Sequence, residues 1–233
     1  MTATVVVGGD RGIGRGLADA LAADGRSVAV LADGAVDLTD PAAVRSALDA
    51  AAATSPVTTV VLAHLDPAGF RAAPLVELSE GAWAAAAERS LRAAFVVLQQ
   101  AHAVVPDGAR VVLVLPTVAA SGAAGLVPLC TAVEGVRVMA KAVARRWGAR
   151  GITVNTIEVD LAAFVLGAGV DDADGPPGSA APVPAVSQLG TAALPPASAV
   201  ADVVALIEML ESDTGAALTG ALLVADRGTV MQP

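Results

Sequence analysis

Tyrosine is absent from this chain of 233 residues, and aromatic residues of all kinds make up only 2% of it. The chain also contains a single lysine, Lys141, and a single asparagine, Asn155. The absence of tyrosine excludes every mechanism in which a tyrosine hydroxyl acts as the general acid or base. Any activity must use other side chains.

Cysteine and long apolar runs are scarce as well. Cys130 is the only cysteine, so no disulfide can form within the chain, as is typical of proteins in the reducing cytoplasm. No run of about 18 uncharged apolar residues suggests a membrane span, and the opening MTATVVVGGDRG does not resemble a signal peptide. A net charge of −9 argues against nucleic acids and anionic membranes as partners. We therefore expect a cytoplasmic protein with neither partner.

The chain is rich in short valine runs that alternate with alanine-rich amphipathic segments. This pattern predicts βα units around a parallel sheet, in one domain that spans residues 1–233. The expected strands are Thr2–Val7, Ser27–Leu31, Thr58–Leu62, Arg110–Leu115, Ile152–Ile157 and Ala221–Val224. The expected helices are Gly14–Asp24, Pro41–Ala53, Ser79–Val104, Leu129–Trp147 and Pro195–Glu211.

Two segments depart from this alternation. Only residues 32–35 separate the second strand from the segment VDLTD, Val36–Asp40, so the helix expected after that strand is truncated. Residues 166–196 are rich in glycine, proline and alanine, which predicts a mobile excursion rather than a linker between domains.

Gly8, Gly12 and Gly14 form a GxxxGxG pattern between the first strand and the first helix. Such glycines permit a tight turn and let a diphosphate approach the backbone at a helix N-terminus. They also permit close packing of the helix on the strand. The pattern alone does not separate these two interpretations.

The segment VGGDRGIGRGLADAL resembles the opening of the short-chain dehydrogenase/reductase family. VDLTD, LVELSEGAW, ARRWGARGITVN and LTGALLVADRG resemble later family segments, in the same order, and the chain is most similar to 3-oxoacyl-ACP reductase-like members. The resemblance implies a Rossmann-like, doubly wound parallel α/β sheet with the helix after the second strand truncated. It also implies an NAD(P) site formed by Gly8, Arg11, Gly12, Ile13 and Gly14, with Asp37 at the adenine end.

The family's catalytic residues are Asn, Ser, Tyr and Lys, and none of them is found at the matching position. Counting back from Asn155 puts Leu129 at the Tyr position and Val133 at the Lys position. These residues are four apart, so they share one helix face. Ser90 stands at the Asn position, and Pro116 or Thr117 at the Ser position, of which only Thr117 has a hydroxyl. The resemblance therefore implies no catalytic residue for the family mechanism.

The cofactor site also departs from the family pattern. Residues 63–66 read AHLD where the family has NNAG, and Val159 and Asp160 stand where it has PG. Asp10 lies in the glycine turn, where its charge would repel a diphosphate, although it is equally suited to cap the first helix. We expect either no cofactor or a weakly bound NAD(P), with no indication of NAD over NADP.

Other polar residues suggest a different chemistry. His64 with Asp66 or Glu158 is a candidate general-base pair, although His64 is also interpretable as an ordinary loop residue. Glu158 and Asp160 place two carboxylates just after a buried strand, either as a site or as a solvated loop edge. No metal site is expected.

The sequence supports three hypotheses about function. The first is a non-catalytic partner subunit in a homo- or hetero-oligomer with an active paralogue of the family. The resemblance implies assembly through the two long helices, Ser79–Val104 and Leu129–Trp147, and through the last strand. The second is a redox-neutral cyclase, dehydratase or isomerase acting on an acyl or polyketide-like substrate. The third is an NAD(P)-dependent oxidoreductase with unconventional catalytic residues.

Overall fold

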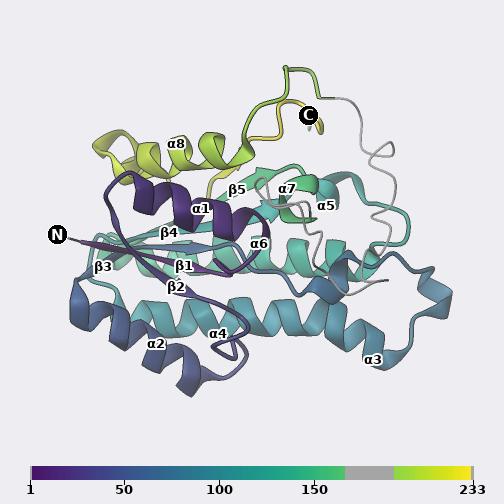
Figure 1. The fold of residues 1–233 in the computed structure, drawn as a ribbon, viewed down its shortest axis with the longest axis horizontal. Coiled ribbons are helices and arrows are strands. Elements are labelled where there is room, and N and C mark those ends of the chain that lie inside the picture. Colours follow the sequence, from purple (N-terminus) through teal and green to yellow (C-terminus); the bar gives the residue numbers. More distant parts are fainter. Residues whose placement is uncertain (1, 166–191, 232–233) are drawn as a thin grey trace.

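The computed structural model describes residues 2–165 and 192–231, and its centre is one sheet of six parallel strands. The strand order is β2-β1-β3-β4-β5-β6 (Figure 1). Because the strands are parallel, their carboxyl ends meet at one edge of the sheet, where α/β proteins bind ligands. The strands are β1 Ala3–Val7, β2 Ser27–Leu31, β3 Val57–Leu62, β4 Arg110–Pro116, β5 Thr153–Val159 and β6 Leu222–Val224.

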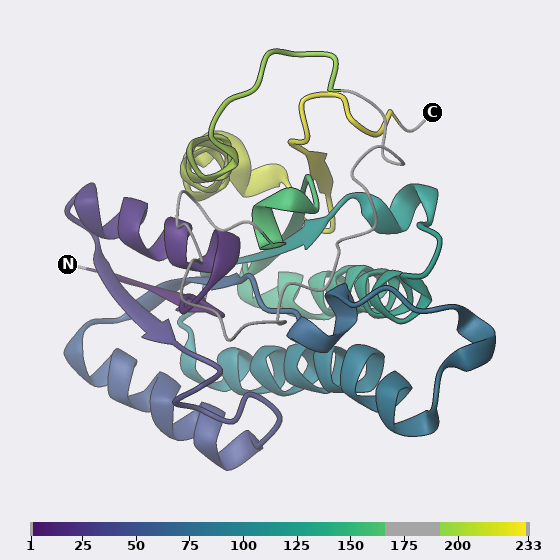
Figure 2. The same ribbon diagram turned by 45° about the vertical axis from the view of Figure 1, so that its right-hand side comes forward.

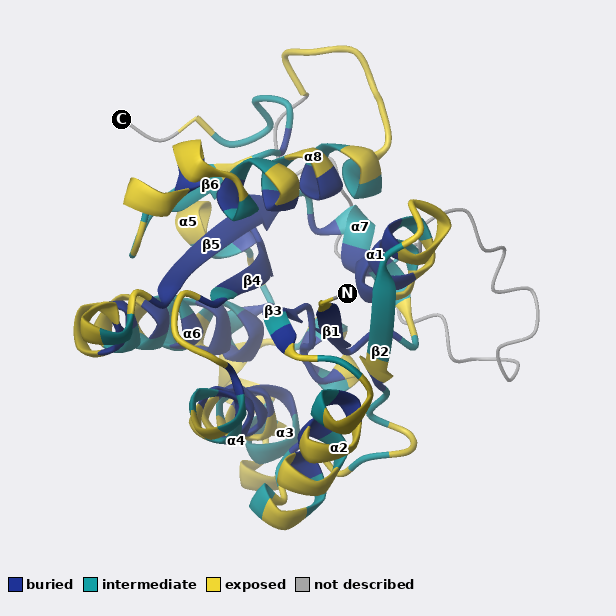
Figure 3. Cartoon of the chain, turned by 90° about the vertical axis from the view of Figure 1, so that its left-hand side faces the viewer, coloured by how far each residue is buried: buried dark blue, intermediate teal, exposed yellow. Residues whose placement is uncertain are grey.

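Helices cover both faces of the sheet. Helices α1 (Gly12–Ala23) and α8 (Ala199–Glu211) pack side by side on one face. The other face is covered by α2 (Pro41–Thr54), α4 (Arg89–Val104) and α6 (Val127–Trp147), as Figures 1 and 3 show. The expected doubly wound, Rossmann-like α/β fold is confirmed. The short helices α3 (Glu80–Trp83), α5 (Val118–Ser121) and α7 (Ala162–Val165) belong to the connections.

The core lies where the central strands meet the inner faces of the helices. Strands β1 and β4 are valine-rich and almost wholly buried, as expected for strands that helices cover on both faces (Figure 3). Leu17 of α1, Leu48 of α2 and Val97 of α4 are fully buried against them. The edge strands β2 and β6 are only partly buried, so the site-bearing centre of the sheet is its most rigidly packed part.

The segment after β2 is shortened, as the sequence predicts. Residues 32–40 form turns rather than a helix. Residues 36–40, the segment VDLTD, form turns that lead directly into α2. Asp40, the type of residue that commonly caps a helix, caps α2: its Oδ1 accepts the N–H of Ala42 at 3.0 Å.

Two helical segments begin later than expected. Ser79 caps the first long helical segment, which begins at Glu80 and includes a π-helical stretch at Ala84–Glu88 before α4. Helix α8 begins at Ala199 rather than Pro195, because Ser198 supplies the cap and Pro196 keeps the residue before it out of helical geometry. Of the excursion predicted at 166–196, residues 166–191 lie outside the described residues.

Candidate functional site at the carboxyl edge of the sheet

The sequence candidates converge on the carboxyl edge of the sheet. The glycine turn follows β1, His64 follows β3, Thr117 follows β4 and Asp160 follows β5. The N-terminal half of α6 lies against this edge through its contacts with the segment Pro67–Phe70, called η1. The topology therefore brings together most of the residues that the family resemblance implies.

The glycine turn is tightly enclosed by the chain itself. Gly8 and Gly12 have positive φ angles of 81° and 50°, which favour glycine. A Cβ at Gly14 would lie 2.2 Å from the carbonyl oxygen of Gly8, so helix α1 packs directly on the turn. These contacts explain the glycine pattern by packing alone.

The outer side of the turn is occupied by α7. A Cβ at Gly12 would lie 2.5 Å from the carbonyl oxygen of Phe164, and α7 packs against α1. The ring of Phe164 lies 6.2 Å from that of Phe70, centroid to centroid, so α7 is also held by η1. Figure 2 shows α7 beside the start of α1. The chain's own carbonyl oxygen thus takes the space beside Gly12.

The charges around the turn also oppose a phosphate. Asp10 was a candidate to cap α1 but does not do so. The N-cap position is occupied by Arg11, whose side chain makes no hydrogen bond to the first turn of the helix. Asp10 Oδ2 instead accepts Arg11 Nη2 at 3.0 Å. Arg11 Nη2 is also 4.0 Å from an oxygen of Asp33. Arg11 is thus engaged by two carboxylates rather than directed only toward an incoming phosphate.

A second arginine extends this acidic cluster. Arg89 Nε is 2.8 Å from Asp66 Oδ2, and Arg89 Nη2 lies 3.6 Å from Asp33 and 4.0 Å from Asp37. Asp10, Asp33, Asp37 and Asp66 therefore outnumber Arg11 and Arg89 by two charges, which repels an anion.

Asp37 is used locally. Its Oδ1 accepts the hydroxyl of Thr39 at 2.7 Å and the N–H of Thr39 at 2.9 Å. These hydrogen bonds lower the pKa of the Asp37 carboxyl. The residue stabilises the turn that leads into α2, and its side chain is exposed.

Leu129 and Val133 lie on one face of α6 and are both fully buried. Leu129 packs against η1: a Cβ at Gly69 would lie 3.3 Å from Leu129 Cδ1. The position that the family resemblance assigns to the catalytic acid is therefore an apolar contact covered by the loop after β3. Lys141, further along α6, is exposed.

Ser90 and Thr117 have structural partners. Ser90 Oγ accepts the N–H of Asp66 at 2.9 Å and so holds the loop after β3. The hydroxyl of Thr117 donates to the carbonyl of Val159 at 3.3 Å, and the N–H of Thr117 donates to the same oxygen at 2.8 Å. This pair of bonds ties the end of β4 to the end of β5.

His64 does not form the predicted pair with Asp66 or Glu158. Its ring is buried, and within residues 2–165 and 192–231 its Nε2 has no hydrogen-bond partner. Asp66 instead binds Arg89 and accepts the N–H of Ala68 at 2.9 Å. Burial lowers the pKa of His64, so its imidazole is neutral at neutral pH.

Glu158 and Asp160 serve different elements. Glu158 is 1% exposed and lies beside α6, with Oε1 3.9 Å from Arg137 Nη1. Burial raises the pKa of Glu158 to about 6, while the Arg137 guanidinium opposes that shift. Asp160 begins α7 by accepting the N–H of Ala162 at 2.7 Å. The two carboxylates thus do not act as a pair, and neither forms a solvated loop edge.

Sequence reasoning missed Arg89, Phe70 and Phe164. The helix that carries Phe164 had a signal, because Asp160 two residues before an Ala-Ala pair is a helix-start pattern. The contact between Phe70 and Phe164 had no signal in the sequence, since these residues are 94 positions apart.

In the described part of the chain, no group of three or more His, Cys, Asp or Glu side chains is arranged to hold a metal ion. Burial raises the pKa of the Cys130 thiol, as expected for an inert cysteine.

Comparisons with known proteins agree with this fold. A family model described as enoyl-(acyl carrier protein) reductase matches residues 32–230. A short-chain dehydrogenase from Burkholderia cenocepacia J2315, solved in complex with NADP, shares 26% identity at a TM-score of 0.76, covering 98% of this chain and 97% of that one. A blue fluorescent protein from a metagenomic library, in complex with NADPH, shares 25% identity at a TM-score of 0.73, covering 99% and 98% of the two chains.

A more distant structure supports the fold alone. A short-chain dehydrogenase/reductase variant from Serratia marcescens has 21% identity and a TM-score of 0.75, covering 98% of this chain and 97% of that one. None of the curated protein sequences matches this chain. Among the residues described, no helix combines the length and apolar character needed to cross a membrane. Because the family model spans most of the sequence and the solved structures share the whole fold, the chain belongs to the short-chain dehydrogenase/reductase family.

Proposed function

We propose that this member of the short-chain dehydrogenase/reductase family does not transfer hydride and acts as a non-catalytic partner subunit beside an active member. The observation that carries the proposal is the face of α6 formed by Leu129 and Val133, which is aliphatic and fully buried. Neither side chain has a proton to give or a charge that binds a ribose. With no tyrosine in the chain, no neighbouring residue takes over the acid role by a shift in register.

The cofactor site supports the same proposal. The carbonyl oxygen of Phe164 fills the space beside Gly12 in the glycine turn, and the surrounding aspartates exceed the arginines in number. The solved relatives from Burkholderia and the metagenomic library contain NADP or NADPH. In this chain, by contrast, the glycine turn packs against α7. We infer that it binds NAD(P) weakly or not at all.

Titration with NADH and NADPH tests this inference. Binding is measured by the fluorescence of the reduced nicotinamide, and an active family member serves as the positive control. We expect no saturable binding by this chain at micromolar concentrations of cofactor. Replacing Phe164 by Gly removes the ring contact with Phe70 and loosens α7, so binding gained only by this variant would identify α7 as the obstacle. Micromolar binding by the unaltered chain would overturn the inference and revive the hypothesis of an oxidoreductase with unconventional residues.

The partner role has its own test. A tagged form of this chain is co-expressed with active family members from the same organism, and the purified material is analysed for stoichiometric second chains. We expect a defined hetero-oligomer that retains the activity of the partner. A chain that forms only homo-oligomers beside every active paralogue would contradict the proposal.

One observation favours the redox-neutral alternative. Burial raises the pKa of Glu158 to about 6, a value suited to general acid–base catalysis near neutral pH. Within the described residues, Oε2 of Glu158 also has no hydrogen-bond partner. Against it, the carboxyl group is 1% exposed and lies beside Arg137 of α6 rather than beside His64. Turnover of acyl thioesters that is lost in both Glu158→Gln and His64→Ala would favour this alternative over the partner role.

A further inference from the structure

A buried polar cluster lies where α6 packs on β5. It consists of Glu134 and Arg137, one turn apart on α6, and of Glu158 near the end of β5. Glu158 is 1% exposed, and the side chain of Arg137 is 19% exposed. The partner role uses none of these three side chains, so what the cluster binds is a separate question.

The three side chains contact one another without pairing all of their polar atoms. Arg137 Nη2 donates to Glu134 Oε2, whereas Arg137 Nη1 lies 3.9 Å from Glu158 Oε1, beyond hydrogen-bond distance. In the part of the chain that the structure describes, five buried side-chain nitrogen and oxygen atoms have no hydrogen-bond partner. Three of the five belong to this cluster: Glu134 Oε1, Arg137 Nε and Glu158 Oε2.

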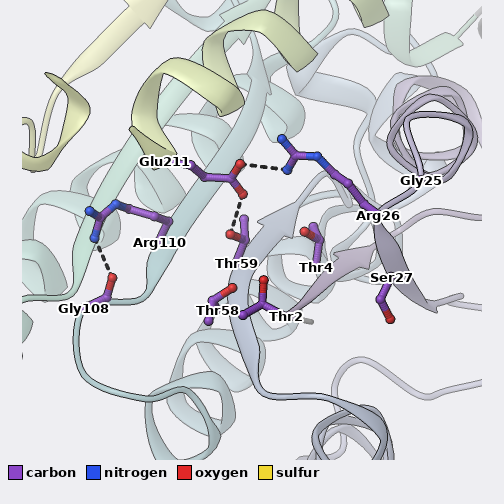
Figure 4. A pocket seen from close by; sticks show the side chains of 10 residues that line it. All are labelled: Thr2, Thr4, Gly25, Arg26, Ser27, Thr58, Thr59, Gly108, Arg110 and Glu211. Carbon is purple, nitrogen blue, oxygen red and sulfur yellow. Dashed lines mark hydrogen bonds and ion pairs between the residues drawn. The ribbon is translucent and has the colours of Figure 1, made fainter. Parts of the chain in front are cut away.

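The polar pocket at the amino ends of the strands differs in this respect. It measures about 470 Å³, and in it Glu211 accepts Arg26 Nη1 at 2.7 Å and the hydroxyl of Thr59 at 2.6 Å, as Figure 4 shows. Arg110 Nε there donates to the carbonyl of Leu210 at 3.0 Å. The charged side chains of that pocket thus bond to the protein itself, whereas the cluster between α6 and β5 has three unpaired atoms.

Unpaired buried polar atoms are unfavourable, because they have lost their hydration without gaining a partner. Native proteins therefore pair nearly all such atoms, either with other protein atoms or with ordered water. A buried water molecule needs a polar site with about two to four hydrogen-bonding partners. The cluster offers three.

The kinds of unpaired atoms decide what the cluster binds. Arg137 Nε carries a hydrogen and needs an acceptor, whereas the carboxylate oxygens of Glu134 and Glu158 need donors. A metal ion or an ammonium group has no acceptor for Arg137, and a fully ionised anion has no hydrogen for the carboxylates. Only a group that both accepts and donates satisfies all three atoms.

The charge of the surroundings also excludes an anion. The charged groups that act on Glu158 are Arg137, Glu134 and Lys141 of α6 and Asp226 after β6. Together with Glu158, three carboxylates thus face two cations. Asp226 is already paired, since its two oxygens accept the N–H groups of Gly228 and Val230 at 2.9 and 2.8 Å.

We propose that one buried water molecule binds in this cluster, accepting the N–H of Arg137 Nε and donating its two hydrogens to Glu134 Oε1 and Glu158 Oε2. Water matches the one donor and two acceptors, and it is small enough for a site between packed elements. Because its partners come from both α6 and β5, the water connects the helix to the sheet.

A crystal structure that resolves ordered waters tests the proposal. Crystals are grown at pH 8, above the Glu158 pKa of about 6, so that both oxygens of this carboxylate are acceptors. We expect density for one water within about 3.2 Å of Arg137 Nε and of both carboxylate oxygens. Direct bonding of Arg137 Nε to another part of the chain, a bound ion in this position, or no density there overturns the proposal.

Variants locate the water in solution. Magnetic relaxation dispersion of water nuclei counts the water molecules that stay inside a protein for long times. Glu158→Leu removes an acceptor and Arg137→Met removes the donor, and each is expected to reduce the count by one. Glu80→Leu on α3 and Arg45→Met on α2 make the same changes at exposed positions and should leave the count unchanged.

Circular dichroism first establishes that the variants are folded. An unchanged count in folded Glu158→Leu and Arg137→Met overturns the assignment of the site. Should neither variant fold, the density in the crystals of the unaltered protein decides the proposal by itself.

Discussion

At the scale of single residues, the positions implied by the family resemblance have become parts of the packing. Ser90 and Thr117 hold loops through hydrogen bonds at 2.9 and 3.3 Å, and Leu129 packs against Gly69. These three positions therefore contribute internal contacts.

Leu129 should behave as a core residue. Because it is fully buried, we expect Leu129→Ala to lower the free energy of unfolding by about 3 kcal/mol through lost burial and the cavity that remains. Urea unfolding followed by circular dichroism measures the change. Leu75→Ala is the control, since Leu75 is 58% exposed and should change the stability by less than about 0.5 kcal/mol. Equal effects of the two substitutions would contradict the packing described for α6.

Glu158 gives the protein a pH dependence with a defined sign. Its folded-state pKa of about 6 lies above the ordinary value of 4.5, so the folded state holds a proton that the unfolded state has released between these values. Stability from this group is therefore full below pH 4.5 and falls as the pH rises through 6, by about 2 kcal/mol in total.

Replacing Glu158 by Gln removes this dependence. We expect Glu158→Gln to be more stable than the parent at pH 8, by up to about 2 kcal/mol, and nearly equal to it at pH 4.5. Chemical unfolding at both values measures the difference, with Glu80→Gln on the exposed start of α3 as the control. A variant that is less stable at pH 8 would show that the charged form of Glu158 is stabilising.

At the scale of elements, the glycine turn illustrates how far a sequence pattern reaches. The strand–turn–helix unit and the cap at Asp40 were predictable, because both rest on residues close together in the chain. The contact of Phe164 with the outer side of the turn was not predictable, since Phe164 lies some 150 positions away from Gly12. The burial of His64 and the contact of Glu158 with Arg137 of α6 likewise depend on residues distant in the chain.

Gly14 in the glycine turn and Gly25 after α1 can be ranked by their surroundings. Gly14→Ala would place a Cβ 2.2 Å from a backbone oxygen, so we expect a loss of about 3 kcal/mol or more in the free energy of unfolding. Gly25→Ala, in the turn after α1, meets nothing within 4 Å and is strained only by its φ of 79°, so we expect about 1 kcal/mol. Thermal unfolding without any cofactor compares them. Similar losses of stability in the two variants would contradict the close contact between Gly14 and the carbonyl oxygen of Gly8.

At the scale of the whole molecule, exposed apolar side chains lie on the helix pair to which the family resemblance assigns assembly. Phe95 of α4 is 46% exposed and Val138 of α6 is 60% exposed, and the two helices pack side by side. Val224 on the edge strand β6 is 44% exposed. Apolar residues on two neighbouring helices are what the proposed partner role requires of a docking surface.

A charge on this surface should disrupt assembly. We expect Val138→Glu to lower the molar mass measured by light scattering toward the 22.8 kDa of one chain, because a carboxylate buried in an interface loses its hydration. Ala50→Glu, at an exposed position of α2, introduces the same charge elsewhere and should leave the mass unchanged. An unchanged mass in both variants would place the contacts elsewhere.

The shortened connection after β2 affects how the sheet opens. Without a helix at residues 32–40, β2 forms a partly exposed edge, and Val30 remains 44% exposed. Amide hydrogens exchange through local openings, which start where few buried contacts hold a strand. The amides of β2 should therefore exchange well before those of β1, β3 and β4, so that the sheet unzips from its β2 side while its centre stays closed.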